Sequence, residues 1–173
     1  MAGTLSTIIR LNSPVLQVHL DKAAINLDAQ KLLLALVGCE SSFGHFIKPR
    51  HEPGYDVGGK YFNKSLHDQF GPNVAYSFSA FQMMYSTAHE LGFDGNPIML
   101  ETSDDYNGGD WIVCPLVCEY WRLRVIERGH KSLEDFFDAY NSGSVGGFIP
   151  TDYIKKGVDY YGQSVKWLEG QLA

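Results

Sequence analysis

The sequence predicts a mainly helical domain that carries a small lobe of loops and a β-hairpin. Apolar residues recur at helical intervals in several segments, most clearly from Trp111 to Arg128. Glycine and proline instead recur every few residues over about 44–78, which is typical of turns. Because no repeat, low-complexity tract or linker divides the chain, we expect one domain, 1–173, with an inserted loop-rich lobe at about 44–78.

The N-terminal part predicts one buried helix. Residues 1–25 mix short apolar pieces with polar residues, and we expect a short helix or turns that pack on the domain. Asn26 is a suitable N-cap for the next helix, which the apolar run 32–37 extends to about Cys39 or Glu40. A helix that is apolar on every side is normally buried, so Glu40 is expected at the edge of the core.

The segment 44–78 predicts a small hairpin or a long ordered loop. Tyr55–Phe62 and Val74–Phe78 are rich enough in aromatic and β-branched residues to form short strands. The histidine and acidic residues between them show no recurrent zinc spacing, such as HExxH, so we expect no metal site.

The rest of the chain predicts helices separated by glycine-containing turns. Ser132 to Asp135 has the pattern of a capping box, which marks a helix start. Pro115 is expected in the first turn of its helix, where the missing N–H costs little. We expect helices, in chain order, at Ser79–Gly92, about Pro97–Glu101, Trp111–Arg128, Ser132–Tyr140 and Thr151–Leu168.

Composition excludes several classes of function. The net charge of −6 and the lack of a Lys/Arg run argue against a nucleic-acid partner. Three cysteines cannot all pair within one chain, so we expect free thiols and folding in a reducing compartment. We expect neither a signal peptide at the N-terminus nor a transmembrane segment, because no apolar run approaches the roughly 20 residues that span a bilayer.

Glu40 is the strongest candidate for chemistry in the sequence. Burial at the end of an apolar helix disfavours its charged form, and so does the negative end of the helix dipole. Both effects raise the pKa of the carboxyl, so that it stays protonated as a general acid must. The alternative is that Glu40 is simply the first solvated residue after a buried helix.

Four segments of the chain contain short motifs that are informative together. They are Glu40-Ser41-Ser42-Phe43, Ser79 to Ala88 with Leu91-Gly92, Ala139-Tyr140-Asn141-Ser142-Gly143, and Tyr153-Ile154 with Val158 and Tyr160-Tyr161. In this order they resemble the soluble lytic transglycosylase family, whose lysozyme-like members cleave peptidoglycan, and the resemblance covers roughly 27–161. Ser79 and Ala80 stand where the family has Gly-Leu, Tyr85 stands where it has proline, and the gap from Glu40 to Gln82 is longer than usual.

The resemblance implies a lysozyme-like α+β fold and one catalytic glutamate, without a cofactor or a metal. Glu40 would protonate the glycosidic oxygen between MurNAc and GlcNAc. It would then take the proton of the C6 hydroxyl, which gives a 1,6-anhydro product. Tyr140 would form a hydrogen bond near Glu40 and orient it. The implied substrate-binding residues are Ser42, Gln82, Asn141 and Tyr153.

Two other functions remain open from the sequence. A hydrolytic muramidase, related to goose-type lysozymes, would need a second carboxylate, from Glu52, Asp56 or Asp68, at roughly 6.5–9.5 Å from the acid. A catalytically silent module could instead grip glycan strands or form a structural part that spans the wall. For each of these functions we expect a monomer that acts on the bacterial cell wall in the periplasm, such as a bacteriophage endolysin or a virion-associated protein.

Overall fold

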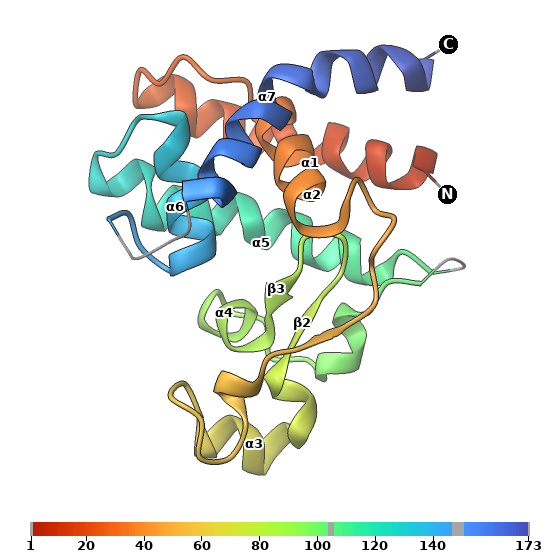
Figure 1. Ribbon diagram of the computed structural model, residues 1–173, viewed down its shortest axis with the longest axis vertical. Helices are drawn as coiled ribbons and strands as arrows, with labels where there is room; N and C mark the ends of the chain where they lie inside the picture. Colours follow the sequence, from red (N-terminus) through yellow and green to blue (C-terminus); the bar gives the residue numbers. More distant parts are fainter. Residues whose placement is uncertain (1, 104–105, 147–150, 173) are drawn as a thin grey trace.

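Helix α2 (Ala29–Ser41) lies at the centre of the larger, helical lobe (Figure 1). It packs against α1 (Ala2–Lys22) and against α7 (Thr151–Leu172). The computed structural model describes residues 2–103, 106–146 and 151–172, with side chains described between 5 and 164. Its helices and small three-stranded antiparallel sheet confirm the predicted class, mainly α with a small β-containing lobe. The lysozyme-like arrangement stays a prediction.

Helix α1 is one continuous helix, where a short helix or turns were expected from the sequence. Pro14 has no N–H to donate to the Arg10 carbonyl, and the Ser13 hydroxyl donates to that carbonyl instead, at 3.3 Å. This replacement, together with core packing on both sides of the proline, carries the helix through it. Four of its large aliphatic side chains are fully buried: Ile8, Ile9, Leu16 and Leu20.

Helix α2 begins two residues later than expected. Its N-cap is Asp28, whose side chain accepts the Lys31 N–H at 2.9 Å, and not Asn26. At the other end Ser42 adopts the left-handed conformation (φ 51°) and closes the helix, so Glu40 lies in its last turn. Most residues of the helix are buried, which confirms that the carboxyl stands at the edge of the core.

The smaller lobe is organised around the antiparallel sheet, in the order β1–β2–β3. Strand β1 is Arg50–His51, β2 is Tyr76–Phe78 and β3 is Met83–Met84. Ser77 in the middle strand pairs with residues on both sides, Arg50 of β1 and Met84 of β3. The strand expected at 74–78 is therefore present as β2.

The strand expected at Tyr55–Phe62 is wrong. The 3₁₀ turn η1 (Pro53–Tyr55) and further turns occupy this stretch, because glycine and proline favour turns over a strand. Helix α3 (Lys64–Phe70) follows, with Asn63 as its N-cap, and it was not predicted from the sequence. A second 3₁₀ turn, η2 (Pro72–Ala75), then leads into β2.

A tight turn at 79–82 joins β2 to β3, where a helix was expected to begin. Ser79 (φ 67°) and Gln82 (φ 48°) are left-handed, which a helix does not permit. Met83 and Met84 then pair as a strand, and helix α4 starts only at Tyr85. The helix prediction is therefore wrong up to Met84 and right from there to Glu90.

A buried carboxyl fastens this turn to the helical lobe. Asp110, in the first turn of α5 (Gly108–Arg124), is 1% exposed and accepts the Ala80 N–H at 2.8 Å. Burial raises the pKa of Asp110 to about 6, against the hydrogen bonds from Ala80, Thr102 and Ser79 that lower it. The position of the β2–β3 turn thus depends on a side chain of the opposite lobe.

The remaining helices lie where the sequence predicts them, with shifted ends. Pro115 lies inside α5 and not in its first turn, because α5 begins three residues earlier than expected. The capping box of Ser132 and Asp135 is confirmed. No helix in the described part of the chain is long and apolar enough to cross a bilayer. The further elements are α4 (Tyr85–Glu90), η3 (Pro97–Leu100), η4 (Ile126–Arg128), α6 (Leu133–Ser142) and α7.

Replacing Asp110 with alanine tests whether the buried carboxyl holds the lobes together. We expect the free energy of unfolding in urea to fall by about 1–3 kcal/mol, because the Ala80 N–H loses its acceptor inside the core. Asp159→Ala, at an exposed position of α7, is the matched control and should stay within about 0.5 kcal/mol of the wild type. Equal losses in the two variants would contradict the anchoring role.

The same pair of proteins gives a pH dependence with a defined sign. The folded chain keeps the Asp110 proton at pH values where the unfolded chain has released it, because the pKa is raised on folding. This contribution to stability is complete below pH of about 4 and is lost as the pH rises through about 6. The stability difference between wild type and Asp110→Ala should therefore shrink over that range, and a difference that grows would contradict it.

Candidate active site

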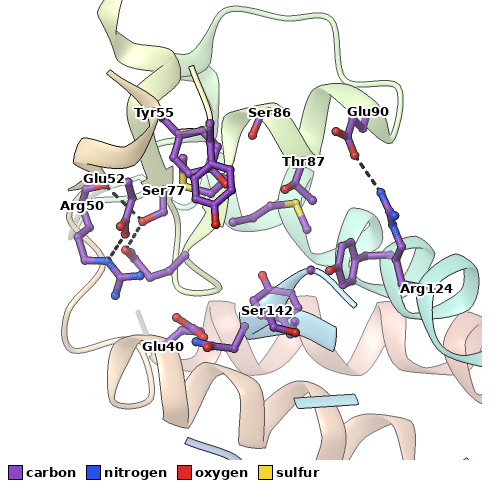
Figure 2. Close-up of a pocket in the computed structure, with 18 of the residues that line it drawn as sticks. Glu40, Arg50, Glu52, Tyr55, Ser77, Ser86, Thr87, Glu90, Arg124 and Ser142 are labelled. Carbon is purple, nitrogen blue, oxygen red and sulfur yellow. Dashed lines mark hydrogen bonds and ion pairs between the residues drawn. The ribbon is translucent and has the colours of Figure 1, made fainter. Parts of the chain in front are cut away.

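A cleft of about 610 Å³ is lined by residues of both the helical lobe and the smaller lobe. Four of the residues selected from the sequence line it: Glu40, Gln82, Tyr140 and Asn141. Figure 2 shows Glu40 and Ser142 on one wall and Glu52, Tyr55 and Thr87 on the facing wall. The fold therefore brings residues that are far apart in the sequence to one concave surface.

Glu40, in the last turn of α2, is partly buried and lines the cleft. Burial raises its pKa above the usual value for a glutamate. The hydrogen bond from Tyr153 and the positive charges of Arg50 and Lys156 oppose that rise, and the negative charge of Glu52 adds to it. The net effect is a raised pKa, in the direction expected from the sequence.

Tyr153 holds the Glu40 carboxyl, and Tyr140 does not. The Tyr153 hydroxyl donates to Glu40 Oε1, whereas the Tyr140 hydroxyl donates to the Phe81 carbonyl at 2.9 Å. The contact expected of Tyr140 therefore belongs to Tyr153, which does not itself line the cleft. Tyr140 instead joins α6 to the β2–β3 turn beside the carboxyl.

The contact with Tyr153 requires α7 to lie very close to α2. Gly38, one turn before the end of α2, permits this approach: a Cβ there would meet the rings of Phe43 and Tyr160 at 2.7 and 2.9 Å. On α7, a Cβ at Gly157 would meet the Phe137 ring at 2.5 Å. Gly38 thus permits the close packing of α7 on α2, and Gly157 the close packing of α7 on Phe137 of α6.

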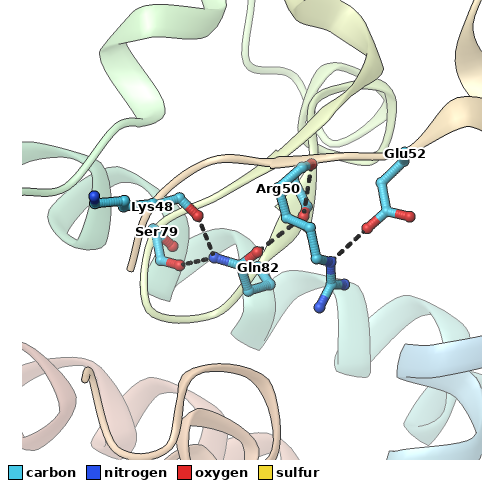
Figure 3. Close-up of polar contacts among 6 residues, drawn as sticks. Lys48, Arg50, Glu52, Ser79 and Gln82 are labelled. Atoms are coloured by element: carbon cyan, nitrogen blue, oxygen red, sulfur yellow. Dashed lines mark hydrogen bonds and ion pairs between the residues drawn. The ribbon is translucent and has the colours of Figure 1, made fainter. Parts of the chain in front are cut away.

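The amide group of Gln82 forms three hydrogen bonds within the protein (Figure 3). Its Nε2 donates to the carbonyls of Ser79 and Lys48, at 2.8 and 3.3 Å, and its Oε1 accepts the Ser77 hydroxyl at 3.0 Å. Both amide hydrogens are used, which leaves one lone pair of Oε1 for a ligand. Gln82 thus holds together the turn, β2 and the segment that precedes β1, and substrate binding by Gln82 stays a prediction.

Ser42 and Asn141 differ in their relation to the cleft. Ser42 caps α2 in a left-handed conformation and does not line the cleft. Asn141, in the last turn of α6, is exposed and lines the cleft beside Tyr140. Of the two, Asn141 is placed to contact a bound molecule.

Of the three candidates for a second carboxylate, the structure places Glu52 in the cleft. Its Oε1 accepts Arg50 Nε at 2.6 Å. Asp56 is bonded to His51 Nε2 at 3.0 Å and Asp68 pairs with Lys64, and neither of these aspartates lines the cleft. The ion pair of Arg50 and Glu52 therefore stands opposite Glu40.

Several other lining residues were not predicted from the sequence. Tyr55 and Tyr61 from the turns after β1 face each other with ring centroids 5.2 Å apart, and both line the cleft. Arg124, in the last turn of α5, pairs with Glu90 of α4 at 3.0 Å, and both also line the cleft. Two tyrosines in a glycine-rich segment were the sequence signal that could have indicated Tyr55 and Tyr61. The pair of Arg124 and Glu90 depends on how the lobes meet, which no local pattern shows.

Within the described residues, no group of three or more His, Cys, Asp or Glu side chains is arranged to hold a metal ion. Cys114 and Cys118 are buried free thiols and Cys39 is a partly buried one. Comparison of the chain with models of protein families, with curated proteins and with solved structures finds no match. The geometry of the cleft is accordingly the basis for assigning a function.

Replacing Tyr153 with phenylalanine should raise the pKa of Glu40 further. In the wild type this hydrogen bond stabilises the carboxylate form of Glu40. Without it, Glu40 would keep its proton to a higher pH. The pKa can be followed by the ¹³C shift of labelled glutamate carboxyls, assigned with Glu40→Gln. Tyr140→Phe is the control, because its hydroxyl bonds to Phe81. A larger rise in Tyr140→Phe than in Tyr153→Phe would contradict this assignment.

Proposed function

We propose that this protein is a peptidoglycan lytic transglycosylase, which cleaves the β-1,4 bond between MurNAc and GlcNAc. The observation that carries the proposal is the Glu40 carboxyl, which lines an open cleft and whose pKa is raised by burial. A general acid needs such a raised pKa and access to the leaving oxygen. The four segments that resemble the transglycosylase family supply the choice of substrate.

The proposed reaction uses Glu40 twice. Its proton passes to the glycosidic oxygen as the bond to C1 breaks, and the carboxylate then takes the proton of the C6 hydroxyl while the C6 oxygen bonds to C1. The products are a free GlcNAc hydroxyl and a 1,6-anhydro MurNAc end, and no water is consumed. Tyr153 stabilises the carboxylate between the two steps by donating to Oε1.

Hydrolysis is the second candidate function, and the observation that favours it is the position of Glu52. The negative charge of Glu52 acts on Glu40, so the two carboxyls face each other across the cleft. An inverting hydrolase holds a base opposite its acid to activate water. Arg50 occupies one oxygen of Glu52 at 2.6 Å and leaves the other for such a water molecule.

Two glutamine variants distinguish these reactions. Glu40→Gln should lower the release of soluble fragments from purified peptidoglycan by roughly 10²–10⁴-fold, because the general acid is lost. Glu52→Gln should keep a rate within a few fold of the wild type if the reaction is a transglycosylation. Circular dichroism and thermal unfolding would verify that both variants fold.

Each contrary outcome has a defined meaning. Near-normal activity of Glu40→Gln would reject the proposed mechanism. A loss in Glu52→Gln as large as that in Glu40→Gln would favour hydrolysis with Glu52 as the base. A wild type that binds glycan strands without releasing fragments would favour a silent binding module. Glu127→Gln, at an exposed position outside the cleft, is the matched control.

A further inference from the structure

The cleft contains a second charged site, formed by Arg124 and Glu90, away from Glu40. Figure 2 shows these two residues at one end of the cleft, and Glu40 with the Arg50–Glu52 pair at the other end. Arg124 ends the helix α5 and Glu90 ends α4, so the site lies where the two lobes meet. The mechanism proposed above makes no use of it.

The guanidinium of Arg124 is only partly occupied. Its Nη2 contacts Glu90 Oε2 at 3.0 Å, and the side chains are 36% and 63% exposed. A guanidinium carries five N–H donors in a planar fork that matches a carboxylate. Among the described residues, Glu90 is the one hydrogen-bonding partner of Arg124. The fork therefore keeps donors available to a molecule in the cleft.

Arg50, the other arginine of the cleft, is less suited to such a contact. Its Nε lies only 2.6 Å from Glu52, and its positive charge acts directly on Glu40. An anion bound there would alter the pKa of the acid that has to react. An anion bound at Arg124 would be held away from the reacting carboxyl.

An exposed ion pair contributes little to stability, roughly 0–1 kcal/mol, so an incoming carboxylate can displace Glu90 at low cost. The chain has a net charge of −6, and Glu40, Glu52 and Glu90 all line this cleft. An anionic substrate therefore needs a local cation to offset repulsion from these side chains. Arg124 supplies that cation at the end of the cleft away from the acid.

We propose that Arg124 binds a carboxylate of the glycan strand's substituents, which distinguishes peptidoglycan from uncharged glycans. This inference rests on the proposed function, because it takes the glycan strand as the occupant of the cleft. The carboxylate belongs either to the stem peptide or, on muramic sugars without a stem peptide, to the lactyl group, whose carboxyl otherwise forms the amide bond to that peptide. Glu90 occupies the Arg124 site when no substrate is bound.

The test measures binding of Glu40→Gln protein to insoluble peptidoglycan by co-sedimentation, so that no cleavage intervenes. Adding Arg124→Gln should raise the apparent Kd by roughly tenfold, the value of one charge-assisted contact of about 1.4 kcal/mol. The matched control is Arg122→Gln, on the same helix, which pairs with Glu119 and Glu127 outside the cleft. It should bind like the parent protein.

Two further comparisons identify the chemistry. Peptidoglycan whose carboxylates are converted to neutral methylamides should bind the parent protein as weakly as native peptidoglycan binds Arg124→Gln. The parent protein and Arg124→Gln should bind this modified peptidoglycan with equal affinity. Amidase treatment cleaves the amide bond between the lactyl group and the stem peptide, so the treated strands lack the stem peptide and carry a free lactyl carboxylate. These strands are used as competitors for the binding of native peptidoglycan. If they displace it more effectively from the parent protein than from Arg124→Gln, the carboxylate is that of the lactyl group. If they displace it equally from both proteins, the carboxylate belongs to the stem peptide.

Glu90→Gln provides a change in the opposite direction. Removing the competing carboxylate should tighten binding of native peptidoglycan. Weaker binding, as in Arg124→Gln, would mean that the pair only bridges α4 and α5, and would overturn the proposal. So would equal binding by parent and Arg124→Gln, or parent binding that is insensitive to methylamidation. Cleavage by the wild type, assayed in parallel, shows separately whether the proposed activity holds.

Discussion

The contact between Tyr153 and Glu40 depends on how closely α7 lies against α2, and the chemistry of the cleft depends on that contact. The two residues are 113 positions apart, and Gly38 permits the close approach of α7 to α2. The packing removes water from the carboxyl, which raises its pKa, while the tyrosine hydroxyl limits the rise. A group in that balance is able both to give and to take a proton. The core thus sets the reactivity of a residue at its edge.

A second set of contacts fixes the facing wall. Asp110 binds the turn between β2 and β3, Gln82 joins the same turn to Lys48 just before β1, and Tyr140 bonds to it from α6. These bonds support the wall of the cleft that carries Arg50 and Glu52. The polar residues of the turn are therefore used mainly to build the site, and the exposed side chains around it are left to meet a substrate.

The sequence predicted the fold class and the place of Glu40 at the edge of the core because both depend on local patterns. An all-apolar helix that ends in a glutamate indicates a carboxyl at the edge of a core, and the structure places Glu40 there. The errors arise where distant contacts override local preference. Helix α1 continues past Pro14, where the Ser13 hydroxyl bonds to the Arg10 carbonyl. A hairpin forms at Ser79, where a helix was predicted, and Asp110 binds its turn. Tyr153, brought close by helix packing, makes the contact with Glu40 that was expected of Tyr140. No local pattern contains the pairing of Arg124 with Glu90, which joins two lobes.

The proposed mechanism depends on one carboxyl that acts without water, and the products of the reaction test that claim most directly. Mass spectrometry of fragments released from purified peptidoglycan by the wild-type protein distinguishes the two routes. Muropeptides that end in 1,6-anhydro MurNAc, one water lighter than their reducing counterparts, are the predicted result. Reducing ends alone would contradict the transglycosylase mechanism and would assign Glu52, opposite Glu40 in the cleft, as the base of a hydrolase.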